Sequence, residues 1–174
     1  LEYLGYEVHY VKNITDVGHM RDDQLDSLSG PDKIELAAET EGKSTSEIAA
    51  FYTRAWLEDE ALINILPVDV MPRATDHIPE MIDIVKKLEA HGHTYEADGS
   101  TYFRISTLPG YGRLSQVELA PESSLSRVEN DEYEKEDARD FVLWKATRPE
   151  EPTWDYGLGP GRPGWHIECS AMAR

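Results

Sequence analysis

The sequence is short of cysteine, of basic residues and of long apolar runs, and each shortage excludes a class of protein. Its 174 residues include one cysteine, Cys169, so no disulfide framework can form within the chain. Lysine and arginine total 17 against 34 aspartates and glutamates, a formal net charge of −17. Such a charge repels phosphate backbones, so we expect no autonomous nucleic-acid binding. No apolar run approaches the roughly 20 residues of a membrane span, so we expect no membrane partner.

An initiating methionine and a basic leader segment are also absent, because the chain opens with Leu1-Glu2-Tyr3-Leu4. We therefore expect a cytoplasmic location, where the sequon at Asn13-Ile14-Thr15 stays unmodified. The missing methionine also suggests that the sequence begins inside a longer protein. Apolar residues make up 40% and charged residues 29%, which is typical of a folded domain.

The order of apolar patterns and breakers predicts an α/β chain. Alternation over residues 6–15 predicts a strand, and Gly5 before it ends a short helix, which favours a parallel sheet. Residues 33–41 suit a helix stopped by glycine. The box Ser44-Thr45-Ser46-Glu47 starts the next helix. One face of that helix is apolar and carries Ile48, Tyr52, Ala55, Trp56 and Leu62.

A further helix and several strands follow. The helix has Thr75 or Asp76 as its cap and Pro79 in its first turn. A hairpin is predicted over residues 93–105, and a short buried strand over residues 140–146. We expect residues 107–139 to form an exposed, mobile insertion. Residues 147–164 are expected to form a long loop, because they hold four prolines and four glycines.

Two motifs near the C-terminus suggest chemistry but favour plainer interpretations. The glycine-rich stretch 157–164 contains two prolines and no following lysine, so a rigid turn is favoured over a phosphate-binding loop. His166-Ile167-Glu168 has the His-x-Glu form of zinc deaminases, but the required pair of cysteines is missing.

Cys169 leaves three interpretations open. A lone cysteine is most often a small buried apolar residue. It could instead be a metal ligand near His166 or Glu168, although zinc needs three or four protein ligands and remote residues would have to complete the site. A nucleophilic role would need a base partner, which the sequence does not identify.

Taken together, several segments resemble cysteinyl-tRNA synthetases, in the same order and over nearly the whole chain. The last two are the most specific. The segments are Tyr10–Asp16 (YVKNITD), Asp32–Ala38 (DKIELAA), Arg73–Ile82 (RATDHIPEMI), Gly99–Phe103 (GSTYF), Gly110–Ser115 (GYGRLS), Asp140–Lys145 (DFVLWK) and Gly161–Met172 (GRPGWHIECSAM).

The resemblance implies a partial Rossmann-like class I synthetase core with an α+β connective insertion. Residues 1–66 would belong to the catalytic domain, residues 67–139 to the connective insertion, and residues 140–174 to the returning catalytic domain. The parent enzyme would join cysteine to ATP as an adenylate and pass the acyl group to tRNA.

The resemblance also implies three site residues. Cys169 matches one ligand of a zinc ion that takes the substrate thiolate, and zinc prefers a thiolate to the hydroxyl of serine. Trp165 matches a residue that closes over the substrate side chain. Thr15 matches a residue lining the cysteine pocket.

The departures from this family lead to further expectations. The His-Ile-Gly-His loop, the Lys-Met-Ser-Lys-Ser loop, the other zinc ligands and the anticodon-binding domain are not in the sequence. We therefore expect an internal fragment that is inactive alone and has an incomplete zinc site. The mycothiol-pathway ligase, which uses the same cysteine-adenylate step, is an alternative. A non-catalytic interaction protein derived from a synthetase is another.

Overall fold

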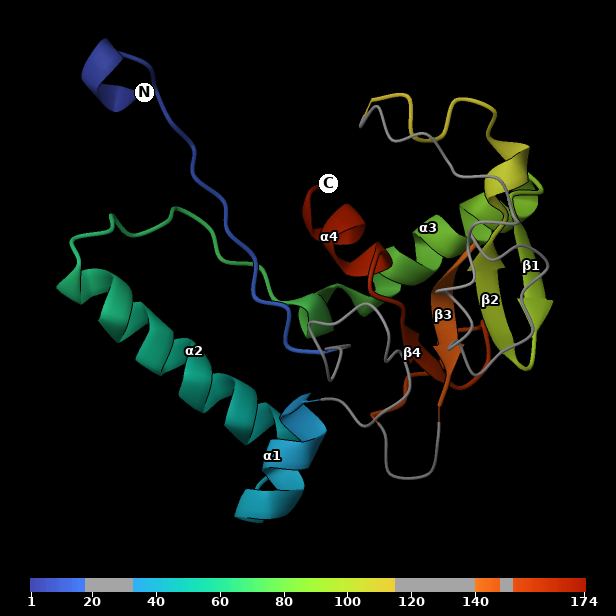
Figure 1. Cartoon of the computed structure of the whole chain (residues 1–174), viewed down its shortest axis with the longest axis horizontal. Coiled ribbons are helices and arrows are strands. Elements are labelled where there is room, and N and C mark those ends of the chain that lie inside the picture. The colour runs from blue at the N-terminus through green and yellow to red at the C-terminus, as the bar shows by residue number, and fades with distance from the viewer. Residues whose placement is uncertain (18–32, 115–139, 148–151) are drawn as a thin grey trace, which may run out of the picture.

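A four-stranded antiparallel sheet forms one layer of the computed structural model, which describes residues 1–17, 33–114, 140–147 and 152–174 (Figure 1). The strands lie in chain order: β1 (Thr94–Ala97), β2 (Ser100–Phe103), β3 (Phe141–Ala146) and β4 (Gly161–Pro163). Asp98 and Gly99 join β1 to β2 with positive φ angles of 47° and 73°. Both signs match a tight hairpin turn, so the predicted hairpin is confirmed.

Helices lie at each predicted place. The helices are η1 (Glu2–Leu4), α1 (Lys33–Glu41), α2 (Thr45–Leu62), η2 (Ala74–His77), α3 (Ile78–Ala90), η3 (Ile105–Thr107) and α4 (Ile167–Met172), of which η2, η3 and α4 are additional. The capping box is confirmed, because Glu47 N donates to Ser44 Oγ at 3.2 Å and Ser44 N donates to Glu47 Oε2 at 2.8 Å. Pro79 lies in the first turn of α3, as expected.

The core is built around α3, which lies between the sheet and α4. Ile78, Met81 and Val85 are at most 1% exposed. Burying each such side chain contributes about 1.5–3 kcal/mol. Their neighbours in the core are Val17, Ala74, Ile82, Phe103, Ile105, Leu143, Trp144, Ile167 and Ala171.

Residues 6–15 do not form the predicted strand. They lie extended beside residues 68–73, with isolated parallel bridges at Val11–Val70 and Ile14–Arg73. Ile14 N donates to Pro72 O at 2.8 Å, and Ala74 N donates to Ile14 O at 3.0 Å. The expected parallel sheet is likewise not found among the described residues, whose sheet is antiparallel. Two bridges to a single neighbour leave the ladder too sparse for a strand.

The predicted cap of the third helix is also wrong. Thr75 and Asp76 lie inside η2, and no side chain caps α3. Asp16 supplies the acceptor instead. Its Oδ1 accepts from Thr75 N at 3.0 Å, and its Oδ2 accepts from the Thr75 hydroxyl at 2.7 Å. A carboxylate from a distant segment thus satisfies the free backbone donor at the start of the helical run.

The C-terminal third differs from the expected loop at one place. Within residues 147–164, Gly161–Pro163 pairs with β3 as the edge strand β4. An edge position tolerates proline because one side of the strand needs no backbone donor.

Most of the expected mobile insertion, residues 115–139, lies outside the described residues. The sheet joins strands from both sides of the predicted boundary at residue 139, and the domain division stays a prediction.

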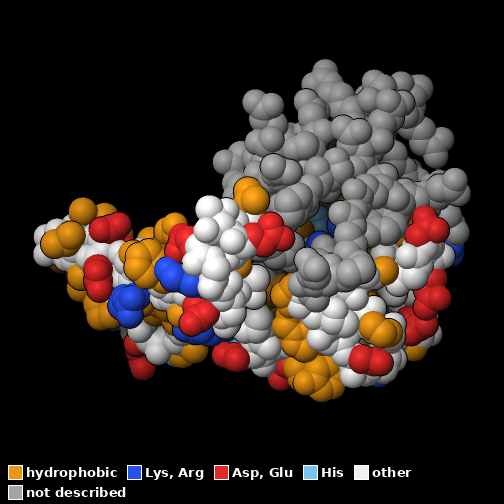
Figure 2. Space-filling model, turned by 90° about the horizontal axis from the view of Figure 1, so that it is seen from below, with side chains coloured by type: hydrophobic (Ala, Val, Ile, Leu, Met, Phe, Trp, Pro, Cys, Tyr) orange, Lys and Arg blue, Asp and Glu red, His pale blue; other side chains and the backbone are white. Residues whose placement is uncertain are grey.

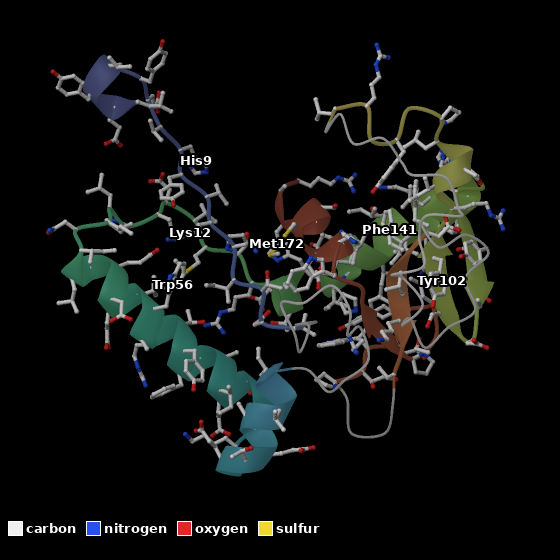
Figure 3. All side chains as sticks on the ribbon, viewed as in Figure 1. His9, Lys12, Trp56, Tyr102, Phe141 and Met172 are labelled. Carbon is white, nitrogen blue, oxygen red and sulfur yellow. The ribbon has the colours of Figure 1, made fainter. Side chains whose placement is uncertain are left out.

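An ion pair and a cation–π contact of Lys12 connect the N-terminal segment to α2. Lys12 Nζ lies 2.7 Å from a carboxylate oxygen of Glu60 and 4.2 Å from the ring centroid of Trp56 (Figure 3). Both ends of this ion pair are largely buried, which strengthens it relative to an exposed pair. The rest of the predicted apolar face of α2 stays open, because only Ile48 is buried there.

Apolar side chains gather on the exposed surface of the N-terminal segment and the C-terminal end of α2 (Figure 2). The most exposed are Leu1, Tyr3, Leu4, Leu62, Ile63 and Leu66. No helix in the described parts of the chain has both the length and the hydropathy to cross a bilayer.

Gly164→Ala is expected to destabilise the fold by about 1–3 kcal/mol, because it overpacks the interior. A Cβ at Gly164 would clash with the carbonyl group of Val142 in β3, which is backbone and cannot move aside. Gly110→Ala is the matched control, because a Cβ there meets no atom within 4 Å. Urea unfolding of both variants measures the difference, and equal stabilities would contradict this packing.

Candidate functional site

The candidate site lies where the segment Asn13–Asp16 meets α4. The side-chain amide of Asn13 joins them, because its Nδ2 lies 2.9 Å from Thr15 Oγ1 and 3.9 Å from Cys169 Sγ. The first contact is an ordinary hydrogen bond and the second is a weak N–H to sulfur contact. Two residues that are far apart in the sequence are therefore brought to one amide group.

The shared core fixes both halves of this arrangement. Val17, just after the segment, is 6% exposed and packs in the same cluster as Ile167 and Ala171 of α4. Because residues four apart share a helix face, burying Ile167 and Ala171 turns Cys169 outward. The Cys169 thiol is exposed, so the interpretation of this residue as a buried apolar side chain is wrong.

Thr15 lines a cavity of about 370 Å³ between its own segment and helices α1 and α2. The walls are largely apolar, and Asp16 and Thr53 add polar groups beside Thr15; the apolar part includes Ile14, Ile34, Ala37, Ile48 and Tyr52. The Thr15 oxygen accepts from Asn13, which leaves its own hydroxyl hydrogen free to donate. An apolar cavity with a few placed polar groups is the usual form of a small-ligand site.

Trp165 is not part of the group formed by Asn13, Thr15 and Cys169. It is 48% exposed, and none of its interactions in the described residues reaches Thr15 or Cys169. The next residue, His166, precedes α4 and packs its ring edge-on against Phe141 at 4.7 Å between centroids. Partial burial of the imidazole lowers the pKa of His166.

Glu168 is the unexpected member of this region. It is 1% exposed, and its Oε1 has no hydrogen-bond partner among the described residues. Burial raises the pKa of Glu168 to about 8, and the nearby positive charge of Arg162 opposes part of that rise. Glu168 lies three residues before Ala171, and residues three apart share a helix face. This spacing is the sequence signal that could have placed Glu168 on the buried face of α4.

The described residues do not complete a metal site. No group of three or more histidine, cysteine, aspartate or glutamate side chains converges within them. Structural zinc takes four protein ligands and catalytic zinc takes three, so Cys169 alone does not fit a resident zinc ion. Its role as a metal ligand therefore stays a prediction.

Comparison with known proteins decides the family. A family model described as the catalytic domain of class I (C) tRNA synthetases matches residues 1–174. The chain belongs to this family. The expected resemblance is confirmed, and the fold is that of a class I synthetase catalytic domain whose described part combines helices with a small antiparallel sheet.

Relatives of known name agree with this assignment to the class I synthetases. The chain is 47% identical to the cysteine–tRNA ligase of Treponema denticola over 99% of its own length and 35% of that protein. It is 45% identical to the cysteine–tRNA ligases of an Exiguobacterium strain and of Thermus thermophilus, covering 34% and 35% of them. The chain thus spans about a third of the relatives that it matches.

Glu168→Gln is expected to stabilise the chain at alkaline pH. The pKa of Glu168 is raised to about 8 in the folded state from the ordinary 4.5. Its contribution to stability is therefore complete below pH 4.5 and is lost as the pH rises through 8. Glutamine cannot ionise, so the advantage of the variant grows over this window by about 1.4 kcal/mol per pH unit.

Urea unfolding between pH 4.5 and 9, with a chelator present, measures this advantage. The exposed Glu89→Gln variant is the matched control. A difference between Glu168→Gln and the unaltered chain that does not change with pH would contradict the buried carboxyl.

The 174-residue chain is expected to bind zinc weakly, because Cys169 is joined by too few further donors. Titration with zinc against a competing chromophoric chelator measures the affinity. Cys169→Ala should change the result little. Tight binding of one zinc per chain that Cys169→Ala abolishes would show that the ligand set is complete.

Proposed function

We propose that this chain is part of an enzyme that activates cysteine with ATP and transfers it to tRNA(Cys). One observation carries the proposal: the cysteine–tRNA ligases match the chain over its whole length at 45–47% identity. Cysteine, ATP and tRNA would then be the partners of the whole protein, and a cytoplasmic location would follow from protein synthesis. The net charge of −17 indicates that tRNA contacts depend chiefly on other residues.

The finer fold proposal is a Rossmann-like core over residues 1–66 and 140–174 with a connective insertion over residues 67–139. Its support is the match of the class I catalytic-domain model to residues 1–174, and the parallel bridges at Val11–Val70 and Ile14–Arg73 join the first core segment to the start of the insertion. Parallel pairing is typical of the doubly wound sheets that bind nucleotides. The sheet that contains β1 and β2 would then extend from the insertion into the returning segment.

Three residues have proposed roles at the cysteine site. Thr15 would line the pocket with its hydroxyl, since it already borders a cavity of about 370 Å³. Cys169 would supply one sulfur donor, since its thiol is exposed beside the Asn13 amide. Trp165 would close over the substrate side chain, since half of its surface is free to make that contact.

The two alternatives remain open for the whole protein. A cysteine ligase of the mycothiol pathway would use the same adenylate, with an amino sugar as acceptor. A non-catalytic interaction protein would use the exposed apolar surface of the N-terminal segment and α2 to bind a protein partner. The names of the relatives favour the tRNA ligase. An anticodon-binding domain encoded downstream in the reading frame would separate it from both alternatives.

A chimeric enzyme tests the proposal directly. This chain would replace the matching third of the Treponema denticola ligase, to which it is 47% identical. We expect the chimera to catalyse cysteine-dependent ATP–pyrophosphate exchange and to charge tRNA(Cys). The 174-residue chain alone is expected to do neither, because it lacks the loops that the family uses to contact ATP.

Single substitutions in the chimera test whether cysteine activation depends on Thr15 and Cys169. Within the chimera, Thr15→Val and Cys169→Ala should each lower kcat/KM for cysteine by tenfold or more, about 1.4 kcal/mol. Thr94→Val, which removes a hydroxyl in β1 that does not border this cavity, is the control. A folded chimera that fails to activate cysteine, beside an active parent ligase, would overturn the proposal.

A further inference from the structure

A second cavity shares Asp16, Ile34 and Ala49 with the cavity that Thr15 lines. Its volume is about 240 Å³. Arg73 reaches it from the residue before η2, and Arg162 reaches it from β4. Thr45, at the start of α2, contributes a hydroxyl, and Trp154 forms part of the wall. Two arginines meet here in a chain whose acidic residues outnumber its basic residues by 34 to 17.

The guanidinium group of Arg73 is available to a ligand. It has no hydrogen bond, ion pair or ring contact with the described residues, and its side chain is exposed. The hydroxyl of Thr45 likewise has no hydrogen bond in that part of the chain. Arg162 is half-buried and lies close enough to Glu168 to act on its carboxyl electrostatically. A fixed and a free arginine therefore border the same space.

The carboxylate of Asp16 also borders this cavity, and its oxygens are already engaged. Oδ1 accepts from Thr75 N at 3.0 Å, and Oδ2 accepts from the Thr75 hydroxyl at 2.7 Å. These two donors offset part of its negative charge toward an incoming anion. Among the described residues that line the cavity, two arginines accompany this single carboxylate.

We propose that this cavity binds a phosphate group, held by Arg73 and Arg162 with the Thr45 hydroxyl as a neutral donor. The planar guanidinium fork matches the oxygens of phosphate and can donate two parallel hydrogen bonds. The volume is below the roughly 300–1,000 Å³ of pockets for drug-sized ligands, so it suits a phosphate or pyrophosphate unit. The proposal rests on the proposed function, in which ATP and tRNA are partners, and it names residues of this chain that would contact a phosphate group.

The phosphate could come from a free anion or from an RNA backbone, and the chemistry of recognition is shared. The net charge of −17 repels both at long range, so binding depends on contacts inside the cavity. A specific contact of this kind differs from general attraction to a basic surface in one respect. It is lost when one lining arginine is removed and kept when an arginine elsewhere is removed.

Titration of the 174-residue chain with inorganic phosphate, pyrophosphate and a single-stranded oligo(A) RNA tests the site. Amide chemical shifts and calorimetry are the two readouts, at fixed pH and low salt. We expect pyrophosphate to shift the amide signals of Thr45, Arg73 and Thr75. Arg73→Ala should weaken binding about tenfold or more, the effect of losing a hydrogen bond to a charged group.

Arg54→Ala is the matched control, because Arg54 lies on α2 against the ring of Phe51 and does not border the cavity. It should leave the affinity unchanged, and Arg73→Lys should restore only part of it because the fork is lost. Circular dichroism confirms that each variant is folded. Thr45→Val provides a second loss of affinity should Arg73→Ala be unstable.

The three ligands distinguish the source of the phosphate. Binding of phosphate or pyrophosphate without RNA, weakened by Arg73→Ala, supports a site for a free anion. RNA binding with the same dependence on Arg73 supports a site for the backbone. Binding of no ligand at millimolar concentration would overturn the proposal, as would equal losses in Arg73→Ala and Arg54→Ala.

Discussion

The candidate site depends on the burial of one apolar face of α3 between the sheet and α4. Met81 and Val85 have no exposed surface, and the same cluster includes Val17, Ile167 and Ala171. Val17 anchors the segment that carries Asn13 and Thr15. Ile167 and Ala171 anchor the helix that carries Cys169. Protein interiors pack densely, so the buried side chains Val17, Ile167 and Ala171 can occupy only narrowly defined positions. The distance between Asn13 and Cys169 is fixed as a result.

Local signals in the sequence were sufficient for α1, α2, α3 and the hairpin. The capping box at Ser44, the apolar spacing of α3 and the Asp98-Gly99 turn are each encoded within a few residues. Pairing partners were not predictable in this way. The segment 6–15 alternates like a strand, yet whether it forms one depends on a neighbour some sixty residues away.

The errors at η2 and β4 have the same physical origin. Thr75 suits a helix cap by composition, but Asp16 satisfies its backbone donor from a remote segment. Gly161 and Pro163 suit a loop, but β3 offers them an edge where proline is tolerated. In each case a tertiary contact overrode the local preference, which no single-sequence pattern reveals.

The site itself was predicted from the family resemblance rather than from chemistry. Thr15 and Cys169 both lie beside the amide of Asn13, but Cys169 does not border the cavity that Thr15 lines, and their roles stay predictions. The bridging role of Asn13 was missed, because a contact over 156 residues leaves no local signal. Glu168 was missed as a buried acid, because a charged residue on a short helix is normally assigned to its solvent face.

The central claim is that the shared core brings the Asn13–Thr15 segment to Cys169. Cys169 is the sole cysteine and its thiol is exposed, so a nitroxide spin label can be attached there without other changes. Paramagnetic broadening of amide signals then reports proximity to α4. The account predicts strong broadening at Asn13 and Thr15 and none at Glu2–Leu4, which lies far from α4 in Figure 1. Sharp signals at Asn13 and Thr15 in the labelled, folded chain would contradict it.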